Sequence, residues 1–267
     1  MSSTRTHSRN SAHVPTPSLL GVFAHPDDES LLAGGVLARH AAGGARAGVV
    51  TATWAPDSHR ATELAEALAI LGAGRPHMLG HRDARNDASA PDKPRFCDAP
   101  LDELIAQLVV LLREFRPDIV VTHDSVGQLT GHPDHLHTHR VTLLAVEAAG
   151  LAHLYPDAGD PWRIRALYAA THPHSGVGQL GPLLTGVGKT VLSVPDEYVT
   201  TAVDVTPWID QKWRAIQAHR SEAVRERSLP GILARLPEDT RRTLISTEHF
   251  TRLSPLPVPG NPHQLTT

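Results

Sequence analysis

Two clusters of histidine and aspartate hold the side chains best suited to chemistry in this chain. The first is Ala24-His25-Pro26-Asp27-Asp28-Glu29, and the second, much later, is Gly131-His132-Pro133-Asp134-His135. Imidazole nitrogens and carboxylate oxygens bind Zn²⁺, and a catalytic zinc site uses three such ligands while it keeps one position for water. Together the two clusters predict a metal-dependent hydrolytic centre.

Spacing selects candidate ligands within each cluster. His25 and Asp28 stand three residues apart, so at the start of a helix they share a face from which Asp27 points away. His132 and His135 have the same spacing, and we expect His135 to be the third ligand. Chemistry alone leaves the second cluster open among four histidines: His132, His135, His137 and His139.

The other polar residues of the clusters suit acid and base roles. Asp27 is a carboxylate beside the metal but not on it, which is the position of a general base for metal-bound water. His132 could stabilise an oxyanion as an imidazolium or donate a proton to the leaving amine. Asp134 could orient a histidine, although a capping role at a helix start explains it almost equally well.

Each cluster follows an apolar run that is typical of a buried strand, and open α/β sheets place their chemistry at the carboxyl ends of such strands. Strand and helix patterns alternate up to residue 149. We expect strands at 19–24, 47–53, 77–79, 118–122, 164–170 and 199–205, and helices at 30–42, 60–71, 101–115, 136–149 and 207–226. The pattern predicts a Rossmann-like α/β fold with a mostly parallel sheet, helices on both faces and a smaller C-terminal section.

The length of 267 residues suits one domain. We expect a disordered polar tail over 1–17, a single domain over 18–253 and an extended tail over 254–267. Within the domain, 18–150 forms the Rossmann-like core and 151–253 forms the C-terminal section.

Composition excludes several classes of protein. The formal net charge of −3 and the aromatic content of 4% argue against nucleic-acid binding. No stretch approaches 18 uninterrupted apolar residues, and no apolar segment of a signal peptide precedes the first expected strand, so we expect neither a membrane span nor a signal peptide. Cys97 is the only cysteine, which excludes an intrachain disulfide and fits a cytoplasmic location.

The two clusters resemble the AHPDDE and HPDH signatures of the zinc-dependent N-deacetylases of the PIG-L/LmbE type. The resemblance continues through Arg116-Pro117-Asp118-Ile119-Val120-Val121-Thr122 and covers most of residues 19–225. The sections 96–141 and 159–162 are most similar to the deacetylase and amidase branch of the mycothiol pathway.

What the resemblance implies for the site agrees with the chemistry. It implies that His25, Asp28 and His135 hold Zn²⁺, that Asp27 is the general base and that His132 stabilises the oxyanion. Fe²⁺ or Co²⁺ would fit the same ligands.

Two substrate contacts, Arg60 and Asp83, are also implied by the resemblance. Arg60 would suit a phosphate or polyol, and its alternative is a solvated cation at a helix start. Asp83 follows a strand in a polar loop, where a turn residue is the alternative. The resemblance also extends to His219, for which we expect a structural role.

The chain departs from the mycothiol deacetylase pattern at Thr130. That pattern has tyrosine two residues before His132, where a phenol would reach over the metal to polarise the carbonyl or to gate the cleft. Threonine is too short for this, so we expect the chemistry to survive while the substrate can differ from the mycothiol precursor.

The residues predict a hydrolase in which Asp27 and Zn²⁺ activate water to attack an amide carbonyl. The resemblance implies that this amide is the N-acetyl group of an N-acetylglucosamine-like conjugate, so that acetate and a free amine are released. The expected partner is a small-molecule amino-sugar conjugate, and a homo-oligomer is compatible with the sequence. An amidase for a larger acyl group, a thiol conjugate or an antibiotic is the alternative, and a wide apolar cleft near 180–184 would favour it. A non-catalytic metal-binding protein is a third interpretation, although it would need neither Asp27 nor His132. We expect the Gly- and Pro-rich loop 172–188 to decide specificity.

Overall fold

The computed structural model describes residues 15–254, within which one seven-stranded sheet has the order β3-β2-β1-β4-β5-β7-β6. The strands are β1 (Leu19–Phe23), β2 (Ala47–Thr53), β3 (His77–His81), β4 (Ile119–His123), β5 (Ala166–Ala170), β6 (Thr201–Asp204) and β7 (Thr247–Ser254). The first five strands pair in parallel, and β7 runs antiparallel to both β5 and β6. This is the mostly parallel sheet that the sequence predicts.

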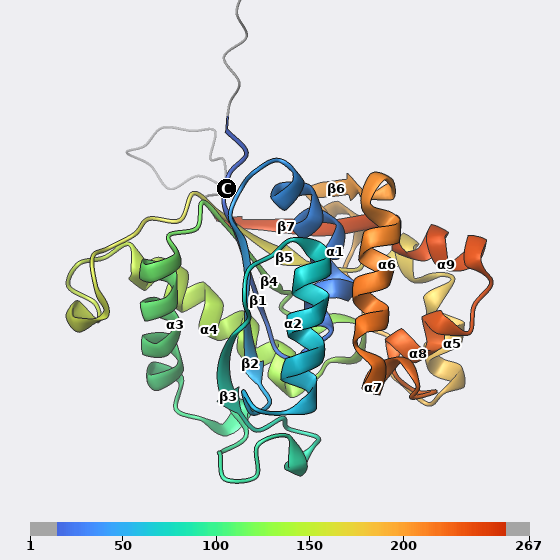
Figure 1. Ribbon diagram of the computed structural model, residues 1–267, viewed down its shortest axis with the longest axis horizontal. Helices are drawn as coiled ribbons and strands as arrows, with labels where there is room; N and C mark the ends of the chain where they lie inside the picture. Colours follow the sequence, from blue (N-terminus) through green and yellow to red (C-terminus); the bar gives the residue numbers. More distant parts are fainter. Residues whose placement is uncertain (1–14, 255–267) are drawn as a thin grey trace, which may run out of the picture.

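Helices cover both faces of this sheet (Figure 1). They are α1 (Asp28–Ala42), α2 (His59–Leu71), α3 (Leu101–Phe115), α4 (Pro133–Ala149), α5 (Leu180–Gly186), α6 (Ile209–Ala218), α7 (Arg220–Ala223), α8 (Leu229–Ala234) and α9 (Glu238–Ile245). Helices α1, α2 and α6 lie on one face, and α3 and α4 lie on the other. Among residues 15–254, no helix combines the length and the apolar character that a bilayer crossing requires.

Alternation along the strands builds a separate core on each face, because successive strand side chains point in opposite directions. Leu19 and Phe23 of β1 pack in the core under α1, α2 and α6. Leu20 and Val22 pack in the core under α3 and α4. Both faces of the central strands are therefore buried, which explains why their sequences are continuous apolar runs.

The strand order reverses between β1 and β4, which are direct neighbours in the sheet. At such a switch point the loops after the two strands leave in opposite directions and open a crevice at the carboxyl ends of the strands. The loop that holds His25 follows β1, and the loop that leads to His135 follows β4. The topology thus brings the two clusters together.

The C-terminal section differs from the sequence-based expectation in several places. The strand expected at 199–205 is not the last one, because β7 follows it and was not predicted. The inward-facing positions of β7 include the charged Glu248, so the strand lacks the apolar alternation that reveals other strands. The helix expected at 207–226 is interrupted at His219, and the loop expected at 172–188 contains α5 and a short 3₁₀ turn.

The C-terminal strands extend the same sheet as the core strands, and this continuity supports our proposal of a single domain over 18–253. The two predicted tails lie almost entirely outside the described residues. Of them, only 15–17, which carry no regular secondary structure, and Ser254, which ends β7, are described.

Candidate active site

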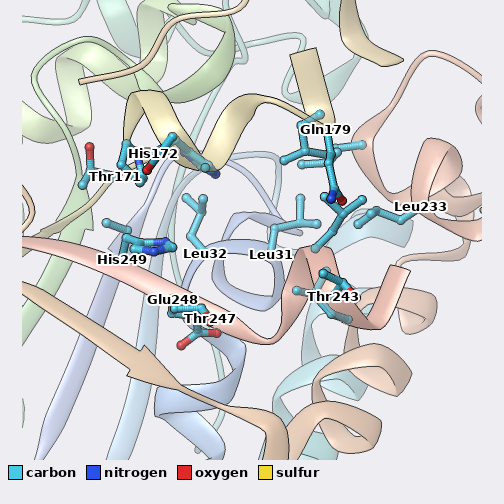
Figure 2. Close-up of a pocket in the computed structure, with 18 of the residues that line it drawn as sticks. Leu31, Leu32, Thr171, His172, Gln179, Leu233, Thr243, Thr247, Glu248 and His249 are labelled. Carbon is cyan, nitrogen blue, oxygen red and sulfur yellow. The ribbon is translucent and has the colours of Figure 1, made fainter. Parts of the chain in front are cut away.

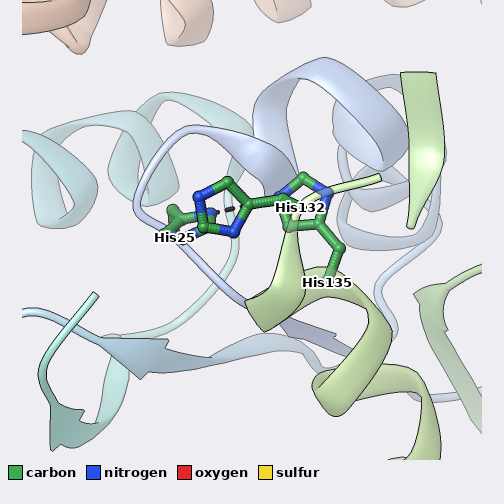
Figure 3. A group of neighbouring side chains, drawn as sticks. All are labelled: His25, His132 and His135. Atoms are coloured by element: carbon green, nitrogen blue, oxygen red, sulfur yellow. Dashed lines mark hydrogen bonds between the residues drawn. The ribbon is translucent and has the colours of Figure 1, made fainter. Parts of the chain in front are cut away.

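Three predicted ligands converge at the switch point. His25 Nδ1 lies 3.1 Å from His135 Nε2 and 3.3 Å from Asp28 Oδ2, while His135 Nε2 lies 3.4 Å from Asp28 Oδ1. Figure 3 shows the rings of His25 and His135 approaching each other, with the ring of His132 beside them. Ligands about 2.0–2.1 Å from a tetrahedral ion are separated from one another by about 3.3 Å. The three side chains therefore have the donor types of a divalent-cation site and lie at contact distances suited to one, with His25 and His135 approaching different carboxylate oxygens of Asp28.

The start of α1 brings His25 and Asp28 together. The backbone N–H of His25 donates to Asp28 Oδ2 at 2.8 Å, which closes a short turn between β1 and the helix. Asp27 lies inside this turn with φ of 131°, in a region that a residue with a side chain rarely adopts. Strain of this kind costs about 1–3 kcal/mol and collects at functional sites.

Asp27 faces the cleft beside the three donors, and its side chain is 14% exposed. Burial raises the pKa of Asp27 to about 7, and the adjacent carboxylates of Asp28 and Glu222 add to the rise, while the Arg60 guanidinium opposes it. A carboxylate whose pKa lies near neutrality is well matched to general base catalysis.

Arg60 borders the cleft, as a substrate contact would, but it is not the solvated cation that the alternative interpretation requires. Its side chain is 5% exposed rather than solvated, and its guanidinium already contacts protein groups. Nη1 donates to Glu222 Oε1 at 2.8 Å, Nη2 lies 3.3 Å from Asp27 Oδ2, and Nη2 also donates to the carbonyl of Pro26. These contacts of Nη1 and Nη2 hold Asp27 in place, while Nε of Arg60 has no hydrogen-bond partner within residues 15–254.

His132 caps α4, since its Nδ1 accepts a hydrogen bond from the backbone N–H of Asp134 at 3.2 Å. Burial and the nearby rings of His25 and His135 lower the pKa of His132 well below its usual value. In this arrangement the ring is neutral rather than an imidazolium, so it can stabilise an oxyanion through its N–H.

Asp134 and Asp83 lie behind and beside the histidines. Asp134 is wholly buried, and its Oδ2 lies 3.2 Å from His25 Nε2 and accepts from the backbone N–H of Ala84 at 2.8 Å. Although burial acts against it, the contacts of Asp134 and Asp28 raise the pKa of His25. Asp134 therefore contacts His25 from outside the cleft lining, whereas Asp83 borders the cleft 3.6 Å from His25 Nε2.

His123 is a buried histidine of the site that sequence reasoning missed. It ends β4, its ring stacks on that of His135 with 4.0 Å between centroids, and its Nε2 lies 3.4 Å from Asp28 Oδ2. Its Nε2 also accepts the backbone N–H of Ala24 at 2.9 Å, so this nitrogen is engaged and less suited to bind an ion than His25 Nδ1. The available signal was its place at the end of an apolar run, which matches that of the first cluster.

His219, for which the sequence predicts a structural role, lies outside the cleft lining. Its Nε2 lies 2.8 Å from Glu29 Oε1, and both side chains are wholly buried. Although burial acts in the opposite sense for each group, the mutual attraction lowers the pKa of Glu29 and raises that of His219. The pair joins the start of α1 to the break between α6 and α7.

The cleft over these residues has a volume of about 690 Å³. Thr130 lies on its wall at the position where the mycothiol deacetylase pattern has tyrosine. The C-terminal section supplies the opposite wall, including Lys189, Arg225 and Arg227. From the stretch 172–188, only His172, Leu184 and Gly188 face the cleft.

Comparison with known proteins places this geometry in a family. The family model for PIG-L, described as GlcNAc-PI de-N-acetylase, matches residues 20–146. The chain is 40% identical to 1D-myo-inositol 2-acetamido-2-deoxy-alpha-D-glucopyranoside deacetylase of Rhodococcus jostii (strain RHA1), and the match covers 87% of this chain and 90% of that protein. The conserved protein TT1542 of Thermus thermophilus superposes with a TM-score of 0.62 at 27% identity, over 94% of this chain and all of the other. An N,N'-diacetylchitobiose deacetylase of Pyrococcus horikoshii shares the fold, with a TM-score of 0.61 at 19% identity over 89% of this chain and 84% of the other. The chain therefore belongs to the PIG-L family of deacetylases, as the resemblance of its two histidine clusters indicated.

Proposed function

We propose that this chain hydrolyses the N-acetyl amide of an N-acetylglucosamine-type conjugate in a metal-dependent reaction. The observation that carries the proposal is the convergence of His25, Asp28 and His135 to mutual distances of 3.1–3.4 Å, with Asp27 beside them. The names of the relatives support the substrate class, since the Rhodococcus jostii protein is a deacetylase of an inositol-linked 2-acetamido sugar.

His25, Asp28 and His135 would hold the metal, and the proposed ion is Zn²⁺ because two imidazoles and one carboxylate form a typical catalytic zinc set. When bound, such an ion polarises the amide carbonyl and lowers the pKa of water toward neutrality. Asp134 would keep the His25 ring oriented through its contact with Nε2. Fe²⁺ and Co²⁺ are compatible with the same donors.

Asp27 would take a proton from the attacking water and pass it to the nitrogen as the C–N bond breaks. Arg60 holds the Asp27 carboxylate at 3.3 Å, so the base is fixed before the substrate arrives. His132 would donate a hydrogen bond to the carbonyl oxygen as negative charge develops there. The products are acetate and a free amine.

The setting of the reaction follows from the same proposal. The partner is a small-molecule amino-sugar conjugate, and the polar wall from Lys189 to Arg227 would face its polar parts. A cytoplasmic location is also proposed, because the single Cys97 is a free thiol.

The test is acetate release from N-acetylglucosaminyl-inositol and from N-acetylglucosamine, with zinc content measured in the same samples. Asp27→Asn should retain the metal and lose about 10²-fold or more in kcat. Asp57→Asn, which changes an exposed aspartate outside the cleft, serves as the matched control and should keep full activity. A metal-loaded wild-type protein without turnover on either substrate would overturn the proposal and favour either hydrolysis of larger amides or a non-catalytic metal-binding role.

A second candidate is hydrolysis of an amide with a larger acyl group. The observation that favours it is a leucine-rich cavity which adjoins the cleft close to Leu180.

A further inference from the structure

A second cavity, of about 300 Å³, lies next to the active-site cleft between α1, α8, α9 and the stretch that follows β5 (Figure 2). We call it the side chamber. Its lining combines apolar side chains, mainly Leu31, Leu32, Leu180, Leu233 and Ile245, with polar ones that include Gln179, Thr247 and His249. Figure 2 shows Leu31 and Leu32 between its two ends, with His172 at one end and Thr243 toward the other.

The side chamber and the cleft share part of their lining: Leu31, Leu32, His172 and Leu229 border both. Leu31 and Leu32 follow Asp28 by three and four residues on α1, so they occupy the next turn of the same helical face. Leu31 and Leu32 therefore belong both to the cleft that holds the catalytic centre and to the side chamber. The side chamber begins about one helical turn from a proposed metal ligand.

Charge distinguishes the side chamber from the rest of the cleft. Arg85, Lys189 and Arg227 border the cleft, and within residues 15–254 none of them has an acidic partner at ion-pair distance. These groups suit the hydroxyl-rich or anionic part of a conjugate. The leucine-rich part of the side chamber suits the other side of the amide, which is the acyl group.

The charged residues in the chamber wall are already neutralised. Lys212 Nζ lies 2.8 Å from Glu248 Oε1, and both side chains are almost fully buried. The Glu248 carboxylate also accepts the backbone N–H groups of Gly35 and Val36. The chamber therefore presents no net charge that an apolar ligand would have to desolvate.

The volume of the side chamber exceeds what an acetyl group needs. An engineered protein cavity of about 150 Å³ stays dry and binds benzene. A cavity of about 300 Å³ accommodates a ring or a chain of several carbons.

We propose that the side chamber binds the acyl group of the substrate, and that this chain hydrolyses amides of acyl groups several carbons long. The inference rests on the proposed amide hydrolysis: water adds to the carbonyl, the C–N bond breaks, and a longer carboxylate leaves in place of acetate while nitrogen takes the proton. It assigns the chamber to acyl selection and the charged wall of the cleft to the amino-sugar conjugate.

The first experiment measures kcat/KM for glucosamine amides with acetyl, butanoyl, hexanoyl and octanoyl groups. In the wild-type protein, kcat/KM should rise by about three- to fourfold per methylene until the chamber is filled. Thr243→Phe, at an exposed position on the chamber wall, should lower the ratio of hexanoyl to acetyl kcat/KM by about tenfold. Thr240→Phe adds the same side chain to an exposed position of α9 outside the chamber and should keep the wild-type ratio.

The second experiment uses calorimetry to measure binding of N-hexanoylglucosamine and N-acetylglucosamine to the metal-free protein, where no hydrolysis occurs. The hexanoyl compound should bind at least about tenfold more tightly, and Thr243→Phe but not Thr240→Phe should abolish the difference. If the acetyl amide is hydrolysed, kcat/KM falls steadily as the acyl group lengthens, and the two compounds bind equally, the inference is overturned and the proposed function stays intact. Selective binding of the hexanoyl compound without turnover of any amide would instead overturn the proposed function and support the side chamber as a binding site for the acyl group.

Discussion

The carbonyl oxygen of Gly127 lies 3.2 Å from His135 Nδ1, on the side of the ring opposite the nitrogen that approaches His25 and Asp28. A carbonyl can only accept a hydrogen bond, so this contact places the proton on Nδ1 and leaves Nε2 with a free lone pair. The backbone after β4 thereby selects the tautomer of His135 that can bind a metal ion. Gly127 has φ of 77°, a conformation that favours glycine.

Gly127→Ala should therefore weaken metal binding by about 10- to 100-fold, which is the usual effect of disturbing a partner of a ligand. An added Cβ at this position would lie 3.0 Å from Gly131 Cα and from Leu136 Cγ, so the carbonyl must shift. Competition with a chelator of known zinc affinity measures the effect. Gly44→Ala is the matched control, because Gly44 has nearly the same φ but nothing within 4 Å of the added Cβ. Equal zinc affinities in the two variants would contradict the role given to Gly127.

Arg60→Met should destabilise the protein by about 3 kcal/mol, because it leaves the largely buried carboxylates of Asp27 and Glu222 without their shared cation. Urea unfolding measures the loss. Arg220→Met removes an exposed pair with Glu66 and should cost less than about 1 kcal/mol. An equal loss in the free energy of unfolding for the two variants would contradict a larger stabilising contribution from the buried contacts of Arg60.

Thr130→Tyr should raise kcat for N-acetyl substrates by about tenfold, because a phenol on the cleft wall adds a donor for the developing oxyanion. Thr130→Phe supplies the same ring without the hydroxyl and should give no increase. Steady-state kinetics on the same N-acetyl substrate compares the three proteins. An equal gain from both variants would mean that ring packing, and not the hydroxyl, is what threonine lacks.

The sequence predicted the parts of the fold and of the site that depend on local spacing. The apolar runs located β1 and β4, and the three-residue intervals picked out His25, Asp28 and His135, which the structure brings together. Both signals act within a few residues, since strand alternation and the helical face are local properties. The meeting of the clusters followed from the rule for parallel sheets rather than from any residue pair.

The features that the sequence did not reveal depend on distant partners. Arg60 is buried because Glu222 lies opposite it, and these residues stand 162 positions apart in the chain. Glu248 occupies a buried position of β7 because Lys212 compensates its charge, and this charged residue breaks the apolar alternation by which a strand is recognised. A charged residue is predicted to be exposed unless its partner is known, so residue spacing alone could not show that Arg60 and Glu248 are buried.

A final prediction concerns His172, which borders both the cleft and the side chamber. Burial lowers the pKa of His172 from 6.5 to about 4, and the nearby charges of His249 and Lys212 add to the shift. Between these two values the unfolded chain binds a proton that the folded protein does not. The free energy of unfolding is therefore highest, as far as His172 is concerned, above pH 6.5. It decreases as the pH falls toward 4, by up to about 1.4 kcal/mol per pH unit.

Urea unfolding of the wild-type protein and of His172→Phe at intervals from about pH 4 to about pH 8 tests this sign. The variant keeps an apolar ring in the half-buried position but has no group to titrate, so its stability relative to the wild-type protein should improve as the pH falls. His59→Phe, which replaces an exposed histidine at the start of α2, should follow the wild-type curve. A constant difference between His172→Phe and the wild-type protein across this range would show that His172 titrates alike in the folded and unfolded chains, and that the neutral ring at the chamber entrance is not enforced by burial.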